Sequence, residues 1–247
     1  KRDTRVAHVE AGLRSGNWAM PEEVNRVVTD HVSDLLFAPT DRATDALAAE
    51  GIADGVYETG DVMYDALLAV RERVRDRPTP ESAPDGEYVL ATVHREANTD
   101  DPARLRSILS ALSATPLPVV LPAHPRTTDA LARHGIDTAD YPGIEFVQPV
   151  GYLAFVALLD GAERVATDSG GVQKEAFYLD TPCVTLREET EWVETVEAGW
   201  NALVGANEVA IRTALDRSDM PATKPTPYGD GDAAERIAEV LDDVTTR

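Results

Sequence analysis

The stretch RVATDSGGVQKEAF, residues 164–177, decides the fold. It begins with a short apolar run that ends at Asp168, continues with Ser169, Gly170 and Gly171, and then takes on the spacing of a helix. A strand that passes through a tight turn directly into a helix is the repeating unit of parallel α/β sheets. The stretch therefore predicts a parallel sheet that carries helices on its faces.

The same alternation runs through the chain of 247 residues. Short apolar runs predict strands at residues 5–10, 34–40, 56–60, 88–94, 117–124, 144–149, 164–168, 182–186 and 202–205. Helical spacing predicts helices at residues 21–35, 40–51, 61–77, 102–114, 127–134, 152–160, 172–179, 190–198, 206–217 and 231–243. The predicted fold class is α/β.

The strands fall into two groups. The stretch RPTPESAPDG, residues 77–86, holds three prolines and one glycine and is the clearest linker in the chain. A complete α/β unit follows it. The shorter set of strands before it is too small to close a doubly wound sheet of its own, which suggests the second half of a larger domain. The predicted domains are residues 1–77, a linker at 78–86, residues 87–228, and a final helix within 229–247.

Composition excludes several classes of function. The net charge is −21, from 44 acidic and 23 basic residues, which repels nucleic acid and anionic membranes. Only three residues are lysine, against twenty arginines, a composition that suggests a salt-rich cell interior rather than an ordinary acidic protein. No apolar run approaches the ~20 residues of a membrane span. The single cysteine, Cys183, excludes an internal disulfide and favours a reducing, cytoplasmic location.

The turn after residue 168 is a candidate phosphate site. Backbone N–H groups at a helix N-terminus bind phosphate, and Gly170 lets the phosphate approach closely. The Ser169 hydroxyl can add a hydrogen bond, and the Glu175 carboxylate can accept hydrogen bonds from ribose hydroxyls. The alternative is a tight turn followed by an exposed glutamate.

Two more predicted strands end in polar residues. VHREAN (93–98) places His94 beside Arg95, and LPAHPRT (121–127) places His124 before Arg126. A histidine beside an arginine can hold a diphosphate or move a proton. A loop histidine without a role is the alternative for either motif alone. Three such strand ends in one sheet favour a binding site.

A pair of carboxylates is the third signal. Glu10 in HVEAGLRSG (8–16) stands at a strand end, and Glu22 in MPEEVNR (20–26) falls in the first turn of a helix. Two carboxylates in one cleft can divide acid and base roles. The alternative is that Glu22 and Glu23 are favourable charges at a helix start. No Cys/His cluster has the spacing of a metal site, so no structural metal is expected.

Taken together, these motifs resemble the non-hydrolysing UDP-N-acetylglucosamine 2-epimerases. The resemblance spans about residues 5–205. The motifs that carry it, in the order of the family, are HVEAGLRSG, MPEEVNR, APT, TGDVMYDAL, VHREAN, TDSGGVQKEA and LREETEW.

The resemblance implies a fold and a reaction. The fold is GT-B-like, with two Rossmann-type domains, the N-terminal one incomplete here, an active site in the cleft between them and a C-terminal helix that packs back on the N-terminal domain. In the reaction, UDP leaves C1 as the C2 proton is removed, and UDP adds again after protonation of the other face of C2, without a cofactor. Members of the family are usually homodimers, which implies a homodimer for the full-length protein.

The resemblance also assigns roles to residues. Glu10 and Glu22 match the acid/base carboxylates, and His94 matches the histidine near the diphosphate. Ser169 and Gly170 match the phosphate-binding turn, Glu175 the ribose-binding glutamate, and Phe155 a residue of the uracil pocket. The positions of a second, activating UDP-sugar in some bacterial members match Arg95, Glu96 and His124, and Arg14 is assigned to the cleft or to that second site.

The chain departs from the family in two respects. The TRPE-type motif and the GDT motif that precede these segments in the family do not occur here, so the resemblance predicts little or no turnover by this chain alone. TEWVE (190–194) stands where TERPE is usual, as in relatives that act on UDP-2,3-diacetamido-2,3-dideoxyglucuronic acid. Alternatives are therefore epimerisation of that sugar, a GT-B glycosyltransferase, or a UDP-sugar-binding protein without catalysis.

Overall fold

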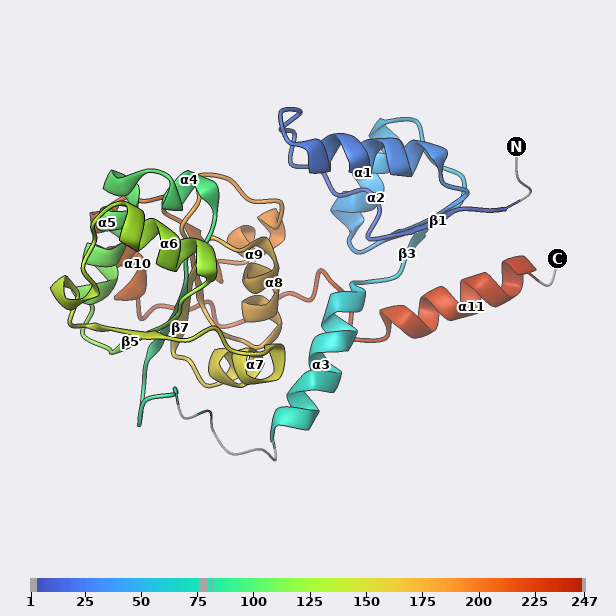
Figure 1. The fold of residues 1–247 in the computed structure, drawn as a ribbon. Coiled ribbons are helices and arrows are strands. Elements are labelled where there is room, and N and C mark those ends of the chain that lie inside the picture. Colours follow the sequence, from blue (N-terminus) through green and yellow to red (C-terminus); the bar gives the residue numbers. More distant parts are fainter. Residues whose placement is uncertain (1–3, 76–79, 81, 246–247) are drawn as a thin grey trace. The chain divides into compact units, whose positions relative to one another are not determined.

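The computed structural model describes residues 4–75, 80 and 82–245, which form two compact units (Figure 1). Unit 1 comprises residues 1–69 and 225–247, and unit 2 comprises residues 70–224. Residues 78, 79 and 81 of the predicted linker lie outside the described residues. The domain boundaries drawn from the sequence stay a prediction.

Unit 1 is built on a parallel sheet of three strands in the order β1-β2-β3. The strands are β1 (Ala7–Val9), β2 (Leu35–Ala38) and β3 (Val56–Glu58). The helices are α1 (Pro21–Val32), α2 (Asp41–Ala49), α3 (Val62–Arg75), whose last residues belong to unit 2, and α11 (Ala233–Thr245). Every residue of β2 is buried, as expected of a central parallel strand that is covered on both faces.

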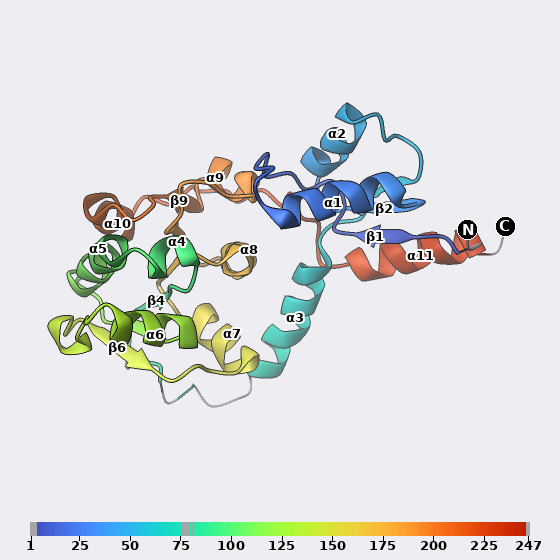
Figure 2. The same ribbon diagram turned by 45° about the horizontal axis from the view of Figure 1, so that its top comes forward.

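Helix α11 belongs to unit 1 although the whole of unit 2 precedes it in the chain (Figure 2). Its Ile237 packs against Leu35 and Phe37 of β2. The carboxylate of Asp65 in α3 accepts hydrogen bonds from the backbone N–H groups of Ala233 and Ala234, which no residue within α11 can satisfy. Apolar contact and a cap supplied by another helix thus hold α11 on the sheet.

Unit 2 contains a six-stranded parallel sheet in the order β6-β5-β4-β7-β8-β9. The strands are β4 (Val89–Thr92), β5 (Val119–Pro122), β6 (Ile144–Val147), β7 (Arg164–Thr167), β8 (Cys183–Thr185) and β9 (Asn201–Leu203). The helices are α4 (Glu96–Thr99), α5 (Pro102–Ser113), α6 (Pro125–Arg133), α7 (Tyr152–Asp160), α8 (Gly170–Tyr178), α9 (Val193–Glu197) and α10 (Glu208–Leu215).

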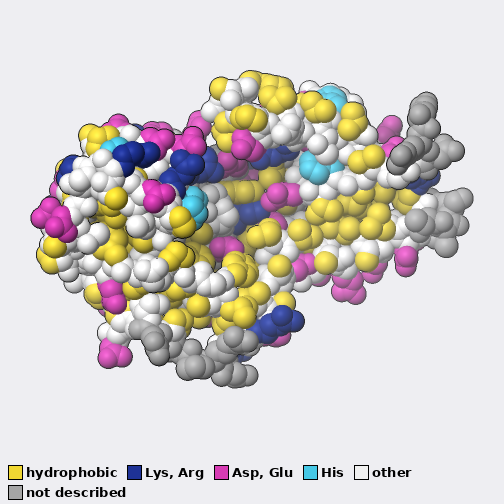
Figure 3. All heavy atoms as spheres, in the orientation of Figure 1, with side chains coloured by type: hydrophobic (Ala, Val, Ile, Leu, Met, Phe, Trp, Pro, Cys, Tyr) yellow, Lys and Arg dark blue, Asp and Glu magenta, His cyan; other side chains and the backbone are white. Residues whose placement is uncertain are grey.

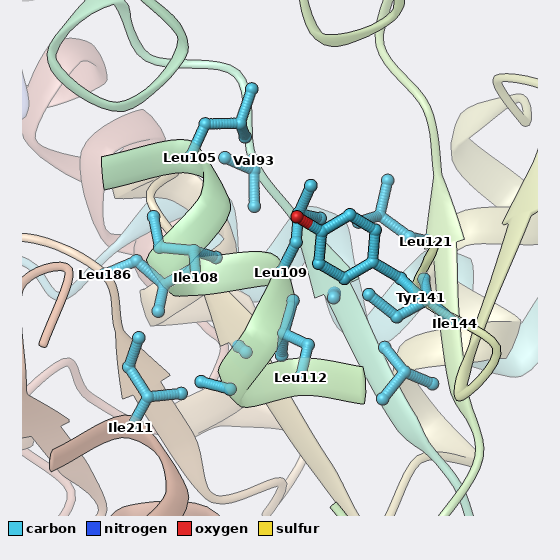
Figure 4. Close-up of a cluster of buried hydrophobic side chains, with 14 of the residues drawn as sticks. Val93, Leu105, Ile108, Leu109, Leu112, Leu121, Tyr141, Ile144, Leu186 and Ile211 are labelled. Carbon is cyan, nitrogen blue, oxygen red and sulfur yellow. The ribbon is translucent and has the colours of Figure 1, made fainter. Parts of the chain in front are cut away.

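A large apolar core lies in unit 2, between α5 and the sheet (Figure 4). Helix α5 supplies Leu105, Ile108, Leu109 and Leu112, whose spacing of three and four residues places them on one face. Ile211 of α10 closes the cluster from the side. This core sets the position of the sheet, and with it the positions of the strand ends.

The predicted α/β class is confirmed, and each predicted strand is present. The structure adds α4 and a 3₁₀ turn, η1 (Thr138–Asp140), which are too short to show a period in the sequence. Cys183 is buried in β8, and burial raises the pKa of its thiol to about 12. Among the described residues, no helix is long and apolar enough to cross a membrane.

Packing predicts unequal costs for two valine-to-alanine changes in helices of unit 2. Val156 in α7 is fully buried, and Val209 in α10 is 72% exposed. Val156→Ala should lower the free energy of unfolding by about 2 kcal/mol through lost burial and a residual cavity. Val209→Ala should change it by less than about 0.5 kcal/mol. Urea denaturation measures both, and equal costs would contradict the burial described for these two side chains.

Candidate functional site

The order of the strands in unit 2 selects one place for a ligand. The chain passes from β4 to β5 on one side of the sheet, and later returns to β7 on the other side of β4. In such sheets a ligand binds outside the carboxyl ends of the strands at the point where the direction reverses. Here that point lies beyond β4 and β7, where His94, Asp168 and Ser169 follow the strands.

The structure brings the polar ends of β4, β5 and β7 together, as predicted. The rings of His94 and His124 lie with their centroids 5.4 Å apart. Nδ1 of His124 accepts a hydrogen bond from the backbone N–H of Arg126 (3.1 Å), and the Arg126 guanidinium pairs with the exposed Glu96 (3.0 Å). His94, Arg95, Glu96 and His124 therefore belong to one surface.

Asp168 is buried beneath this surface and holds the segment after β4 in place by hydrogen bonds. Its side chain is fully buried and accepts hydrogen bonds from the backbone N–H groups of His94 (3.0 Å) and Arg95 (2.9 Å), and from Nδ2 of Asn98 (3.1 Å). The same Asn98 amide group also donates to the carbonyl of Leu186 (3.0 Å). One buried carboxylate thus connects the loop after β4 to the ends of β7 and β8.

His94 is held in a defined orientation. Its Nδ1 lies 3.3 Å from Oδ1 of Asp168, so the ring lies within ion-pair distance of that carboxylate. Burial lowers the pKa of His94, the charge of Asp168 opposes this change, and the charges of His124, Arg95 and Arg126 add to it. The ring is therefore a neutral hydrogen-bond acceptor near pH 7.

A small cavity of about 210 Å³ opens beside His94. It is lined by Thr92, His94, Pro122, His124, Pro149, Val150, Phe155, Ser169 and Val172. Its walls are mostly apolar, and its polar groups come from the strand ends. Such a pocket fits a flat ring that is anchored by a few polar contacts. Phe155, Ser169 and His94 line this cavity together.

The N-terminus of α8 is surrounded by donor groups. A β-carbon placed on Gly170 would lie 3.7 Å from Nη2 of Arg95, 3.7 Å from Nε1 of Trp192 and 3.9 Å from Nη1 of Arg187. The Arg187 guanidinium is itself fixed by two contacts to Glu191 (3.1 and 3.3 Å). These donors add to the positive end of the helix, so the local charge favours an anion although the protein has a net charge of −21. Figure 3 shows basic and histidine side chains together on this unit.

Glu175 lies further along α8. It is 6% exposed, so the alternative interpretation, an exposed glutamate after a simple turn, is wrong. Its Oε1 accepts a hydrogen bond from the hydroxyl of Tyr152 at 2.9 Å.

In unit 1, the chain takes an unusual backbone conformation at Glu10. Its φ is 71°, a left-handed value that is strained for a residue other than glycine. The carbonyl of Phe37 in β2 accepts hydrogen bonds from the N–H groups of both Glu10 (3.1 Å) and Ala11 (3.0 Å), and holds this turn. Glu10 is thereby turned out of the strand while its backbone stays attached to the sheet.

A buried ion cluster fixes the residues after Glu10. Asp30 accepts hydrogen bonds from Gly12 N (3.1 Å), His8 Nδ1 (2.6 Å) and Arg14 Nη1 (2.7 Å). Burial disfavours its charge, yet these bonds hold the pKa of Asp30 below its usual value. Arg14 also pairs with Glu50 through Nε (2.6 Å), so it stabilises the fold of unit 1.

The two neighbouring glutamates of α1 differ in their surroundings. Glu22 is exposed in the first turn. Glu23 is 1% exposed and accepts hydrogen bonds from the backbone N–H groups of Ser15 (3.0 Å) and Gly16 (2.9 Å), with Arg26 at 2.8 Å. Glu23 therefore shapes the loop, whereas the side chain of Glu22 is exposed.

Sequence reasoning missed several residues of these sites. They are Asp168, Asn98, Arg187, Trp192 and Tyr152 in unit 2, and Asp30 and Glu23 in unit 1. The position of Asp168 at the end of a predicted strand was an available signal. The contacts of Asp30 and Tyr152 join elements that are far apart in the chain, and no local pattern shows them.

Two glycines test the geometry of the Glu10 loop. Gly12 and Gly16 both have a positive φ, but a β-carbon on Gly12 would lie 2.3 Å from the carbonyl oxygen of Ala43, whereas nothing lies within 4 Å at Gly16. Gly16→Ala should cost about 1 kcal/mol from backbone strain alone. Gly12→Ala should cost about 3 kcal/mol or more, because the loop must also move. Thermal unfolding followed by circular dichroism compares them, and equal losses would contradict the described loop.

The surroundings of His94 predict the pH at which its ring titrates. In NMR, His94 should have a midpoint below the ~6.5 of a free histidine, and His94→Asn identifies its signal. Asp168→Asn should lower the midpoint further, because the charge that favours the protonated ring is gone. Because the pKa of His94 is lower in the folded protein than in the unfolded chain, the unfolded chain binds the proton more readily. The contribution of His94 to the free energy of unfolding should therefore be lost as the pH falls below ~6.5. A midpoint above that of free histidine would contradict the assigned surroundings.

Comparison with known proteins places the chain in a family. The sequence profile described as UDP-N-acetylglucosamine 2-epimerase matches residues 1–242. A UDP-N-acetylglucosamine 2-epimerase homolog of Methanococcus maripaludis is 43% identical, over 98% of this chain and 70% of that protein. The UDP-2,3-diacetamido-2,3-dideoxy-D-glucuronate 2-epimerase of Pseudomonas aeruginosa is 47% identical, over 96% and 67%.

A solved structure shows the same fold. The crystal structure of Methanocaldococcus jannaschii UDP-GlcNAc 2-epimerase in complex with UDP-GlcNAc and UDP superimposes with a TM-score of 0.87 at 38% identity, over 96% of this chain and 69% of that one. The fold is therefore GT-B-like, with parallel sheets of three and six strands. The chain belongs to the UDP-N-acetylglucosamine 2-epimerase family.

Proposed function

We propose that the protein interconverts UDP-N-acetylglucosamine and UDP-N-acetylmannosamine by inverting C2 of the sugar. The observation that carries the proposal is the donor-lined N-terminus of α8 beside the cavity at His94, in a member of this family. Together they offer an anion site and a flat apolar pocket side by side in unit 2, as a uridine diphosphate requires.

Unit 2 holds the nucleotide in this proposal. The uracil ring enters the cavity against Phe155. The diphosphate meets Ser169 and the backbone N–H groups at Gly170, with Arg95, Arg187 and the Trp192 indole as further donors. Glu175 accepts hydrogen bonds from the ribose hydroxyls. The arrangement of donors around Gly170 and the burial of Glu175 support these roles.

Unit 1 supplies the proton chemistry. One of the carboxylates Glu10 and Glu22 removes the C2 proton while the bond from C1 to the diphosphate oxygen breaks, which leaves a 2-acetamidoglucal and UDP. The other carboxylate delivers a proton to the opposite face of C2, and the diphosphate oxygen then bonds to C1 again. Substrate and product have the same oxidation state, so the reaction needs no external oxidant or reductant.

Electrostatics favours the elimination step. Negative charge develops on the diphosphate as the C1–O bond breaks, and preorganised donors stabilise that charge. The guanidinium of Arg187 is held by Glu191, so it needs no reorganisation. The neutral ring of His94 has one acceptor nitrogen, and a proton taken there would add positive charge beside the diphosphate.

Other functions are less well supported. A glycosyltransferase would also bind a UDP-sugar on this fold, but the similar proteins of high identity are named epimerases. The diacetamido-uronate substrate named for the Pseudomonas relative is the second candidate sugar. The acidic, lysine-poor composition supports a salt-rich cytoplasm as the location of the protein. The family resemblance supports a homodimer, and analytical ultracentrifugation would test this oligomeric state.

Exchange of the C2 proton tests the proposal. UDP-N-acetylglucosamine is incubated in D₂O at molar KCl, without an acceptor, and followed by proton NMR. The assay uses this chain and, in parallel, a version extended by the upstream segment that the family resemblance predicts. Loss of the H2 signal and growth of the manno epimer are expected with the extended chain. Glu10→Gln and Glu22→Gln should slow exchange by about 100-fold or more.

Controls separate chemistry from folding. Glu22→Gln should leave the melting temperature unchanged, because Glu22 is exposed, whereas Glu23→Gln should lower it. UDP binding without exchange in either chain would favour a non-catalytic UDP-sugar protein. Exchange of the diacetamido-uronate sugar alone would replace the proposed substrate with that one.

A further inference from the structure

The contact between Tyr152 and Glu175 has no part in the roles proposed so far. Tyr152 is the first residue of α7 and Glu175 lies in α8, and the Tyr152 hydroxyl donates to Oε1 of Glu175 at 2.9 Å. Within the described part of the chain, no other side chain forms a hydrogen bond with this carboxylate. Tyr152 is 45% exposed and Glu175 is 6% exposed. A surface tyrosine thus holds a buried carboxylate.

The charge of Glu175 depends on this contact. Burial raises the pKa of Glu175, whereas the hydrogen bond from Tyr152 and the nearby charge of Lys174 act in the opposite direction. The ammonium of Lys174 lies 3.9 Å from the centre of the Trp192 ring, which holds it beside the site. Burial and the neighbouring carboxylate raise the pKa of the Tyr152 hydroxyl, so it remains a donor at any physiological pH.

The geometry leaves Glu175 with unused acceptor sites. An ionised carboxylate has about four lone-pair positions, and Tyr152 takes one of them, on Oε1. A vicinal diol, such as the 2′ and 3′ hydroxyls of a ribose, can donate two hydrogen bonds to the lone pairs that Tyr152 does not use. Both bonds form with good geometry only if the plane of the carboxylate is fixed. Without the tyrosine hydroxyl the carboxylate can rotate, and its buried charge is less favoured.

We propose that Tyr152 is a positioning residue for ribose recognition: its hydroxyl fixes the orientation of the Glu175 carboxylate and presents it to the 2′ and 3′ hydroxyls of the ribose. This inference rests on the proposed function, which assigns Glu175 to the ribose. Tyr152 acts through Glu175 and needs no contact with the nucleotide. Its contribution should therefore appear only with ligands that carry the diol.

A comparison of two ligands on two proteins tests this. Isothermal titration calorimetry measures the affinities of UDP and 2′,3′-dideoxy-UDP for the unmodified chain and for Tyr152→Phe. Tyr152→Phe should weaken UDP binding by about tenfold, the effect of one charge-assisted hydrogen bond. It should change binding of the dideoxy ligand by less than about twofold. Glu175→Gln should likewise remove most of the preference for UDP.

A pH series adds a readout that simple loss of packing would not change. The tyrosine hydroxyl favours the ionised form of Glu175, so its removal should raise the pKa of that carboxyl group. Tyr152→Phe should then lose UDP affinity at a higher pH than the unmodified chain, so the affinity of the unmodified chain divided by that of the variant should grow as the pH is lowered. Titration of the diphosphate itself cancels in this ratio.

The controls keep folding and function apart. Tyr57→Phe makes the same chemical change in β3 of unit 1, and it should leave UDP affinity unchanged. Circular dichroism melts show that each variant is folded. Equal weakening of both ligands by Tyr152→Phe, or no weakening of either, would overturn the role of Tyr152 and leave the proposed function in place. An unmodified chain that fails to prefer UDP over the dideoxy ligand would overturn both.

Discussion

The buried carboxylate of Asp168 is the interaction on which the candidate site depends. A buried charge is tolerated only when donors surround it, and here the donors are backbone and side-chain groups of the segment that follows β4. The same carboxylate lies 3.3 Å from Nδ1 of His94, and its charge favours the protonated form of that ring. The position of the loop after β4 and the protonation of His94 therefore both depend on Asp168, which lies where the strand order of the sheet reverses.

Much of the fold could be predicted from the sequence because its signals are local. Short apolar runs, turn residues and helical spacing are properties of neighbouring residues, and all the predicted strands are present. The polar ends of three strands could also be placed together, because parallel strands bring their carboxyl ends to one edge. The short helix α4 had no such signal, since four residues are too few to show a period.

The rest of the site depends on contacts between distant residues. Glu22 and Glu23 are adjacent residues of the same type, so the sequence alone does not distinguish them. Their positions around the helix axis leave Glu22 exposed and bury Glu23, whose carboxylate accepts hydrogen bonds from a loop. Glu175 was assigned to the ribose through the family resemblance, but its partner Tyr152 lies 23 positions away in another helix. Such partners follow from the packing of whole elements, which local patterns do not encode.

The place of α11 in the chain has a consequence for biosynthesis. A ribosome completes unit 2 before it makes the helix that covers β2 of unit 1, because residues 70–224 precede α11. Unit 2 can thus fold while the chain is still being synthesised, and the strands of unit 1 must wait with an uncovered apolar face. The strands of unit 1 are translated before those of unit 2, but α11 covers them only after unit 2 is complete, and during that interval they are exposed to chaperones and to misassociation.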